Sequence, residues 1–362
     1  MRTITLAYTA FNSAPEMTEG SLTIRDVAQR AGVSVATVSR VLSGKGQVHP
    51  NTRERVQAAV REMGYRPSRI ARGFRAQRSS FIGLLISDVE NPFHTSLARA
   101  IEDLAYAHDY RLLLCNTDED LEREQAYLHF LADERVSGVI CAPASESRTS
   151  FRALLDAGIP VVTVDRVATQ TPVDNVRLDN ITAARALTQH LLARGHRRIA
   201  LLGLPADITS GRERLEGFEQ AMRAAGVPVE RALVRLGKGV EPFGLHAARE
   251  LLSQPDCPTA LLTANNMITL GAMKAIRQLG LSMPDDVDLA GFDETPWLSL
   301  LNPTMLIAAQ PIREMGRIAV EMLLSRLRGD RQPPRTVLLP AQIVSHAPDW
   351  AIPLDGTQGG DV

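Results

Sequence analysis

The sequence of 362 residues contains little cysteine and few aromatic residues: three cysteines, two tryptophans, five tyrosines and nine phenylalanines. No two cysteines form a CxxC pair, so we expect neither a zinc site nor a disulfide framework, and no metal or other cofactor. Cys115 and Cys141 lie in apolar runs and are predicted to be buried on strands. Unpaired cysteines are typical of a reducing compartment, which favours a cytoplasmic protein.

Long hydrophobic runs and catalytic signatures are also absent. No apolar run approaches the length of a membrane span, so no membrane partner is expected. The short apolar patch from Leu6 to Phe11 is too weak for a secretory signal. The motifs HExxH, GxSxG, GxGxxG after a strand and the P-loop do not occur. We therefore predict a protein that is not an enzyme and has no catalytic residues.

Charge is distributed unevenly along the chain, although the net charge is only −1. Between Ser21 and Ser80, twelve basic residues face three acidic ones, which leaves nine excess positive charges. The chain from Phe81 onward carries nine excess negative charges. A basic N-terminal part on an acidic body indicates an anionic partner held at the N-terminus, although a merely solvated charged face is the alternative.

The stretch Thr23–Gly44 predicts two helices joined by a tight turn at Gly32. Thr23 and Asp26 have the spacing of a capping box, and Ser34 is a good N-cap for the second helix. The apolar positions of that helix are Val35, Val38, Val41 and Leu42. Its exposed positions are small or polar with one arginine, as suits a helix against base edges: Ala36, Thr37, Ser39 and Arg40.

A helical hairpin within a larger core and a DNA-reading helix-turn-helix are the two interpretations of this stretch. Several of its short motifs resemble the signature of the lactose/galactose-repressor (LacI/GalR) family: Thr23-Ile24, Asp26-Val27-Ala28, Ala31-Gly32-Val33-Ser34 and Thr37-Val38-Ser39-Arg40. The resemblance implies a regulator that binds double-stranded, palindromic operator DNA as a homodimer. The residues expected to contact DNA here are Thr23, Ser34, Val35, Ala36, Thr37, Ser39 and Arg40.

A third helix is predicted from Pro50 to Met63, preceded by His49 where the family usually has a serine N-cap. Asn51 and Arg53 are expected to contact phosphates. The segment 67–80 resembles the family's hinge helix, which enters the minor groove, with Phe74 in place of the usual leucine wedge. A plain basic linker is the alternative. The hinge residues expected to contact DNA are Arg69, Ala71, Arg72 and Phe74.

From Phe81 onward, short apolar runs alternate with helical stretches, which predicts parallel sheets covered on both faces. Strands are expected at 81–86, 111–115, 138–142, 161–165, 199–203, 260–264, 287–291 and 304–309. Helices are expected near 94–107, 121–133, 182–194, 212–225, 245–252, 268–279 and 312–328.

The family resemblance implies that these elements form an α/β two-lobed, periplasmic-binding-protein-like (type I) effector domain behind the all-α head and hinge helix. The expected domains are a disordered extension (1–20), the helix-turn-helix domain (21–66), the hinge (67–80), the effector domain (81–346) and a flexible tail (347–362). Within the effector domain, lobe 1 is expected at about 81–179 and 311–338, and lobe 2 at about 180–310 and 339–346.

Ligands of parallel sheets bind beyond the carboxyl ends of the strands, so residues just after each strand are the candidates for an effector site. An aromatic ring, an arginine fork, amides and a carboxylate there suit a polyhydroxylated ligand, and two arginines leave an acidic sugar open. Several of these positions match the family's pocket. The candidate effector-binding residues are Phe93, His94, Arg166, Ser210, Arg214, Asn265, Asp293 and Gln310.

These observations predict a sequence-specific transcriptional regulator, a repressor of carbohydrate-catabolic genes controlled by a small sugar or sugar-derived effector. A stand-alone cytoplasmic sugar-binding module is the first alternative, and the basic head counts against it. An enzyme is the second alternative, and the absence of a recognisable catalytic set counts against that.

Overall fold

The computed structural model describes residues 22–43, 47–65, 79–298 and 304–345. The chain divides into two compact units, one up to Gln77 and one from Arg78 onward. The expected extension (1–20), the tail (347–362) and nearly all of the expected hinge (67–80) lie outside the described residues, so these expectations remain predictions.

The first unit is a three-helix domain of α1 (Ile24–Ala31), α2 (Val35–Ser43) and α3 (Pro50–Glu62). The predicted capping box is present, because the Thr23 hydroxyl accepts from the Asp26 amide while the Asp26 carboxylate accepts from the Thr23 amide at 2.7 Å. Gly32 ends α1 in the left-handed conformation (φ 61°), as a glycine permits. Ser34 Oγ accepts from the Thr37 amide at 3.2 Å, so Ser34 caps α2.

The core of this unit includes Val27, Val38, Val41 and Val56. Two other apolar residues of α2 are not part of it, because Val35 is 36% exposed and Leu42 is 37% exposed. Of the four apolar residues of this helix, Val38 and Val41 thus pack in the core, and the exposure of Val35 agrees with its place among the residues expected to contact DNA. The side chains of Val35 and Leu42 lie on the outer face of the helix, where the smaller core of three short helices does not reach.

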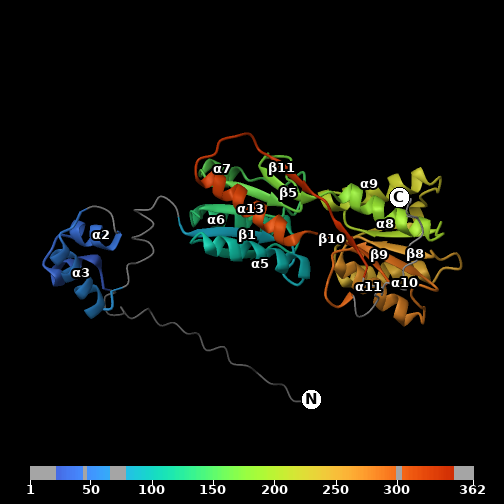
Figure 1. Ribbon diagram of the computed structural model, residues 1–362, viewed down its shortest axis with the longest axis horizontal. Helices are drawn as coiled ribbons and strands as arrows, with labels where there is room; N and C mark the ends of the chain where they lie inside the picture. Colours follow the sequence, from blue (N-terminus) through green and yellow to red (C-terminus); the bar gives the residue numbers. More distant parts are fainter. Residues whose placement is uncertain (1–21, 44–46, 66–78, 299–303, 346–362) are drawn as a thin grey trace, which may run out of the picture. The chain divides into compact units, whose positions relative to one another are not determined.

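Two parallel sheets of the same strand order make up the second unit (Figure 1). The first sheet runs β11-β5-β4-β3-β1-β2 and the second runs β12-β10-β9-β8-β6-β7, with only β12 antiparallel to its neighbour. The strands of the first sheet are β1 (Phe81–Ile86), β2 (Arg111–Asn116), β3 (Gly138–Cys141), β4 (Val161–Val164), β5 (Asp174–Leu178) and β11 (Thr336–Leu339). Those of the second are β6 (Ile199–Gly203), β7 (Val234–Leu236), β8 (Ala260–Thr263), β9 (Asp288–Phe292), β10 (Leu306–Ala309) and β12 (Gln342–Val344).

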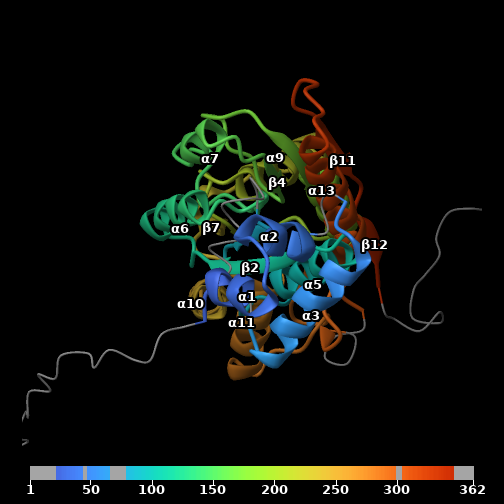
Figure 2. The same cartoon turned by 90° about the vertical axis from the view of Figure 1, so that its left-hand side faces the viewer.

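Helices cover both faces of each sheet, as alternating strands and helices predict. On the first sheet, α5 and α13 pack on one face and α6 and α7 on the other (Figure 2). On the second, α10 and α11 share one face and α8 and α9 the other. Their bounds are α5 (Pro92–Ala107), α6 (Leu121–Asp133), α7 (Arg152–Asp156), α8 (Asn180–Ala193), α9 (Thr209–Ala224), α10 (Glu241–Leu252), α11 (Asn266–Gln278) and α13 (Ile312–Leu327).

Each sheet with its helices is one lobe, and the chain passes between the lobes three times. The passages lie between β5 and α8, between β10 and α13, and between β11 and β12. Lobe 1 thus holds β1–β5, α5–α7, α13 and β11, while lobe 2 holds β6–β10, α8–α11 and β12. In Figure 1 the segment β11–β12 runs from one lobe to the other.

The eight predicted strands and seven predicted helices of this unit are all present, with ends that differ by at most four residues. In the described ranges of this unit, the structure adds six elements that the sequence did not predict: β5, β7, β11, β12, the short α7 and the 3-10 helix η1 (Arg231–Leu233). Strands β7, β11 and β12 lie at or near sheet edges and are half-exposed, so they lack a continuous apolar run. Cys115 and Cys141 are buried on β2 and β3, as predicted. Within the described residues, no helix is long and apolar enough to cross a membrane.

Candidate functional site

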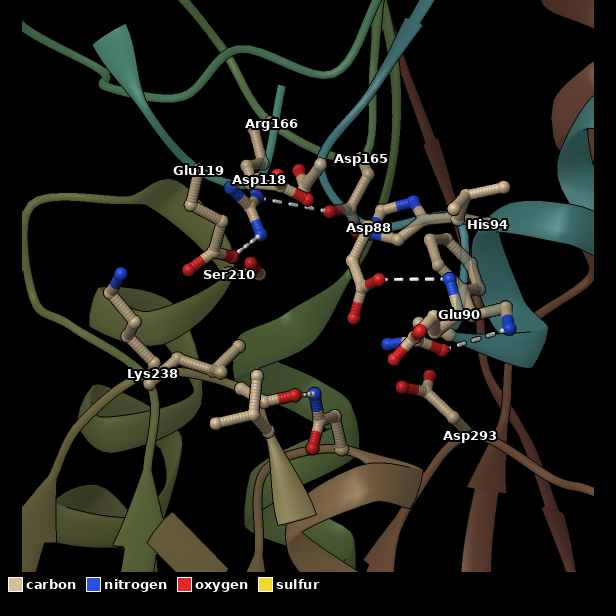
Figure 3. Close-up of a pocket in the computed structure, with 18 of the residues that line it drawn as sticks. Asp88, Glu90, His94, Asp118, Glu119, Asp165, Arg166, Ser210, Lys238 and Asp293 are labelled. Carbon is tan, nitrogen blue, oxygen red and sulfur yellow. Dashed lines mark hydrogen bonds and ion pairs between the residues drawn. The ribbon is translucent and has the colours of Figure 1, made fainter. Parts of the chain in front are cut away.

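A cavity of about 390 Å³ lies between the two lobes, beyond the carboxyl ends of the parallel strands. Its size is within the range typical of small-molecule sites. The structure brings all eight candidate effector-binding residues to its walls, from six separate stretches of chain. Figure 3 shows side chains of both lobes pointing into the same space.

The lobe 1 wall begins with the turn between β1 and α5. Asn91 caps α5 by accepting from the Phe93 amide at 2.9 Å, which places Phe93 and His94 in the first turn of the helix. Their rings meet edge to face with centroids 5.1 Å apart. Burial, together with the positive charge of Arg166, lowers the pKa of His94 from 6.5 to about 3, so its imidazole is neutral. The His94 Nδ1 atom is buried without a partner among the described residues.

Arg166 lines the cavity, but its guanidinium is already engaged within lobe 1. Nη2 donates to Glu119 Oε1 at 2.8 Å, Nη1 donates to the Pro143 carbonyl at 3.4 Å, and Nε lies 3.4 Å from Asp165 Oδ2. Burial opposes the charge of Arg166, but the two carboxylates outweigh it and raise its pKa. The guanidinium of Arg166 is therefore engaged by protein carboxylates, which weakens its predicted part in binding an acidic sugar.

Arg214 enters the cavity from α9 of lobe 2. Its Nε donates to Asn180 Oδ1 at 2.8 Å, its Nη1 donates to the Ala264 carbonyl, and its guanidinium carbon lies 4.0 Å from the centre of the Phe292 ring. Burial lowers the pKa of Arg214, yet an arginine stays protonated in proteins. Two hydrogen bonds and the ring thus fix a charged fork, whose remaining donors face the cavity.

Two aspartates occupy equivalent places in the two lobes. Asp165 follows β4 and Asp293 follows β9, the third strands of their sheets, and both have left-handed backbones (φ 67° and 70°). Such a backbone is uncommon for residues other than glycine and is typical of functional sites. Burial raises the pKa of Asp293, while Arg214 and the Gln310 amide, which donates to Oδ1 at 2.7 Å, partly offset this.

Asn265 lines the cavity but its amide has a structural role. Its Oδ1 caps α11 by accepting from the Ile268 amide at 2.8 Å, and its Nδ2 donates to the Gly239 carbonyl at 2.9 Å. These two bonds leave Asn265 one amide hydrogen and one lone pair of Oδ1 for a ligand, so its expected role as donor and acceptor remains a prediction. The neighbouring Asn266 has neither side-chain atom paired within the described residues.

Buried polar atoms without a partner gather at this cavity. Among the described residues, ten buried side-chain polar atoms lack a hydrogen bond. Half of them belong to residues that line it: Ser87, His94, Arg166, Ser210 and Gln310. Because unpaired buried polar groups cost free energy, this concentration indicates a site built for a polar ligand or ordered water.

Several cavity residues were missed by sequence reasoning. Asn116 at the end of β2, Asp118 and Glu119 beyond it, and Lys238 to Val240 after β7 lie at strand ends that were not considered or not predicted. Asp88 and Glu90 after β1 and Asp165 after β4 lie at strand ends that were considered, but they were not chosen as candidates. The position after β2 was available as a signal, because that strand was predicted. With these residues the cavity wall carries six carboxylates against three permanent cations. No group of side chains in the described ranges has the composition of a metal site.

In the first unit, the residues predicted to contact DNA lie at the start of α1 and along α2. Ala36 and Arg40 are exposed together with Val35, while Thr37 and Ser39 are half-buried. The hydroxyls of Thr23 and Ser34 also serve as helix caps. Asn51 and Arg53 lie in the first turn of α3. The hinge residues Arg69, Ala71, Arg72 and Phe74 lie outside the described residues.

Comparison with known proteins finds two family models on this chain. One, described as bacterial regulatory proteins of the lacI family, matches residues 23–68. The other, described as periplasmic binding proteins and sugar binding domain of the LacI family, matches residues 79–347.

Individual relatives match along most of their length. The ribose operon repressor of Halalkalibacterium halodurans is 36% identical over 305 residues, which cover 84% of this chain and 90% of the relative. The solved structure of the Lac repressor dimer bound to operator and the anti-inducer ONPF is similar with a TM-score of 0.76 at 29% identity, over 90% of this chain and 98% of that one. The structure of a CelR–cellobiose complex has a TM-score of 0.67 at 31% identity, over 90% and 99%.

Proposed function

The chain belongs to the LacI/GalR family of bacterial regulators, and we propose that its effector is a neutral, polyhydroxylated small molecule, a sugar, held in the cavity between the lobes. The protein is a sequence-specific DNA-binding transcriptional regulator. In our proposal it acts as a homodimer that represses carbohydrate-catabolic genes, in line with the relatives named above.

The convergence of unpaired polar atoms on one cavity carries the proposal. Ser210 Oγ of α9, His94 Nδ1 of α5 and Gln310 Oε1 just after β10 are buried without partners among the described residues. A ring of hydroxyl groups, each both donor and acceptor, pairs with such a scattered set better than an apolar ligand does. Phe93 and the fixed fork of Arg214 complete a wall with one aromatic face and one charged donor.

The charges of the cavity favour a neutral ligand over a sugar acid. Arg166 is paired with Glu119 and Asp165, and carboxylates outnumber permanent cations on the wall by six to three. A ligand carboxylate would have to enter this negative field, and only Arg214 and Lys238 of the wall's cations would be left to pair with it. A hydroxyl-rich ligand avoids that cost, and Asp293 can accept its hydrogens. The acidic sugar left open by the sequence is thus the weaker candidate.

The DNA-binding side of the proposal rests on α2. Val35, Ala36 and Arg40 present an apolar, a small and a cationic side chain on the exposed face. These suit a thymine methyl group, close approach to the bases, and a guanine edge, respectively. The effector must bind one conformer of the lobes better than the other for operator binding to respond, with a coupling of about 1–3 kcal/mol.

Titration calorimetry with the purified full chain tests the effector class. The panel pairs neutral sugars, including ribose and cellobiose, with the corresponding sugar acids and sugar phosphates. We expect a neutral sugar to bind and to change the affinity for operator DNA selected from genomic fragments. Tighter binding of an acid or phosphate than of every neutral sugar would refute the proposed class.

Substitution of Arg214 tests the site itself. Arg214→Met should abolish the sugar response and leave operator binding intact, because Arg214 lies in the effector unit. Arg223→Met, at the exposed C-terminal end of the same helix, is the matched control and should keep the response. A normal response in Arg214→Met would mean that the effector binds elsewhere.

A further inference from the structure

Several contacts join the two lobes, among them an ion pair between Arg177 of β5 and Glu213 of α9. Another contact, beside the cavity, is made by an acidic side chain of lobe 1. Glu146 lies in the loop between β3 and α7, and α9 of lobe 2 begins opposite it. Both carboxylate oxygens of Glu146 accept from Arg212 Nη2 at 3.0 Å. The Thr209 hydroxyl donates to Glu146 Oε2 at 3.1 Å. The first turn of α9 is thus tied to lobe 1 by an ion pair and a hydroxyl.

Backbone groups add to the same contact. The Glu146 amide donates to the Asp207 carbonyl at 3.2 Å, and the Val167 amide donates to Thr209 Oγ1 at 3.1 Å. The Thr209 hydroxyl therefore accepts from the backbone of lobe 1 while donating to a side chain of lobe 1. We call this set of contacts among Glu146, Val167, Asp207, Thr209 and Arg212 the interlobe latch.

The loop that carries Glu146 is held firmly within lobe 1. The carboxylate of Glu124, which is fully buried on α6, accepts from the Ala144 amide at 2.6 Å and from the Thr149 hydroxyl at 2.5 Å. The Thr169 amide donates to the Glu146 carbonyl at 2.8 Å. Because both ends and the middle of the loop are anchored, Glu146 acts as a fixed acceptor for lobe 2.

The latch is continuous with the walls of the cavity. Val167 directly follows Arg166, and Thr209 directly precedes Ser210, and both of these neighbours line the cavity from opposite lobes. Arg214 lies one turn further along α9. If Val167 and Thr209 move further apart, the two walls of the cavity must therefore separate as well.

From this arrangement, we propose that the interlobe latch sets how far the cleft opens when no effector is bound, and that Glu146 is its central residue. Glu146 positions the cavity walls through α9 and has no place in the cavity wall itself. The proposal goes beyond the effector class, since closure of the lobes is measurable without any ligand.

The solvent exposure of the Glu146–Arg212 ion pair limits how strongly it can favour the closed lobes. The Glu146 side chain is 19% exposed and that of Arg212 is 45% exposed, so their ion pair is partly screened by water. Pairs of this kind contribute up to about 1 kcal/mol, which corresponds to roughly a fivefold change in the ratio of closed to open lobes.

Pulsed electron resonance between two spin labels measures that ratio in the full chain. The labels are attached at Glu122→Cys in lobe 1 and Pro242→Cys in lobe 2, both exposed, with Cys257→Ser; Cys115 and Cys141 are buried. Labelled chains are diluted into unlabelled chains, so that distances within one chain dominate. Glu146→Gln should shift the closed-to-open ratio about fivefold towards the longer distance, and Arg212→Gln should do the same.

The double variant and the charge exchange sharpen the test. Glu146→Gln combined with Arg212→Gln should open the cleft no further than either change alone, because both remove the same ion pair. Glu146→Arg with Arg212→Glu remakes the ion pair but leaves the Thr209 hydroxyl without its acceptor, so it should restore part of the closed distribution. Glu230→Gln, which breaks the Arg198–Glu230 pair within lobe 2, is the matched control and should leave the distances unchanged.

Three outcomes would overturn the latch. The first is that Glu146→Gln, Arg212→Gln and the unsubstituted chain give the same distance distribution. The second is that the charge exchange leaves the cleft as open as the single variants do. The third is that the Glu230→Gln control shifts the distances as much as Glu146→Gln does. None of them depends on the identity of the effector, so the latch can fail while the proposed sugar site stands, and the reverse also holds.

Discussion

Protonation of His94 should make the effector domain lose stability as the pH falls below neutral. The ring is 4% exposed in the first turn of α5, and burial with the nearby charge of Arg166 lowers its pKa from 6.5 to about 3. The unfolded chain therefore takes up the proton at a higher pH than the native one. His94 contributes its full stabilising effect above pH 6.5, and the effect is lost progressively as the pH falls towards 3.

The magnitude follows from linkage, at about 1.4 kcal/mol per pH unit in that window. Between pH 7 and pH 5 the free energy of unfolding should fall by about 2 kcal/mol because of this group. This loss of about 2 kcal/mol depends mainly on the pKa of His94 in the unfolded chain. In the native protein the ring stays neutral at pH 5 for any pKa well below 5.

Urea unfolding followed by circular dichroism checks this at pH 7, 6 and 5, at one fixed protein concentration. His94→Asn removes the titrating ring, so its unfolding free energy should fall about 2 kcal/mol less than that of the unsubstituted chain over this range. His108→Asn, at the exposed C-terminal end of the same helix, is the control and should follow the unsubstituted chain. A difference between His94→Asn and the unsubstituted chain that stays constant with pH would refute the reasoning.

Three further substitutions test the packing and the charges of the fold. Gly271→Ala would place a methyl group 2.2 Å from a backbone oxygen of α10, so the free energy of unfolding should fall by about 1–3 kcal/mol and calorimetry should show a lower melting temperature; an unchanged melting temperature would contradict this contact. Thr23→Ala removes the capping box with Asp26 and should destabilise the helical head by about 1 kcal/mol in urea unfolding, with a neutral result showing that the cap contributes nothing. Arg326→Leu leaves the carboxylate of Asp174, which has no exposed side-chain area, without its bidentate partner and should cost about 3–5 kcal/mol in the same assay; a loss below 1 kcal/mol would show that water reaches the site.

Local patterns of the sequence were sufficient for most of the fold. The helix-turn-helix was predicted from a capping box at Thr23, a glycine at the turn and apolar spacing, all of which act within a few residues. The buried strands were predicted because a strand covered on both faces is apolar at every position. Strands β7, β11 and β12 were missed because half-exposed edge strands do not have an apolar residue at every position.

The candidate cavity was also within reach of the sequence, because carboxyl ends of parallel strands meet at one edge. The rule of looking after each strand gathered Phe93, Ser210, Asp293 and Gln310 before their contacts were known. It failed where the strand itself was not predicted, as for the loop at Lys238, and where a strand end was overlooked, as after β2. It also did not single out the carboxylates at ends that it covered, such as Asp88 and Asp165.

The sequence by itself determined most of the secondary structure, the kind of head and eight of the residues that border the cavity. Only the tertiary structure decided which of these side chains remain available. Arg166 is taken by Glu119, Asn265 by the backbone at Gly239, and the lobes are joined through Glu146 and Arg212. The partners in these contacts lie between 26 and 66 residues apart in the chain. Spacing and periodicity describe neighbours along one element, whereas hydrogen bonds and charges pair with whatever the fold brings within about 3 Å.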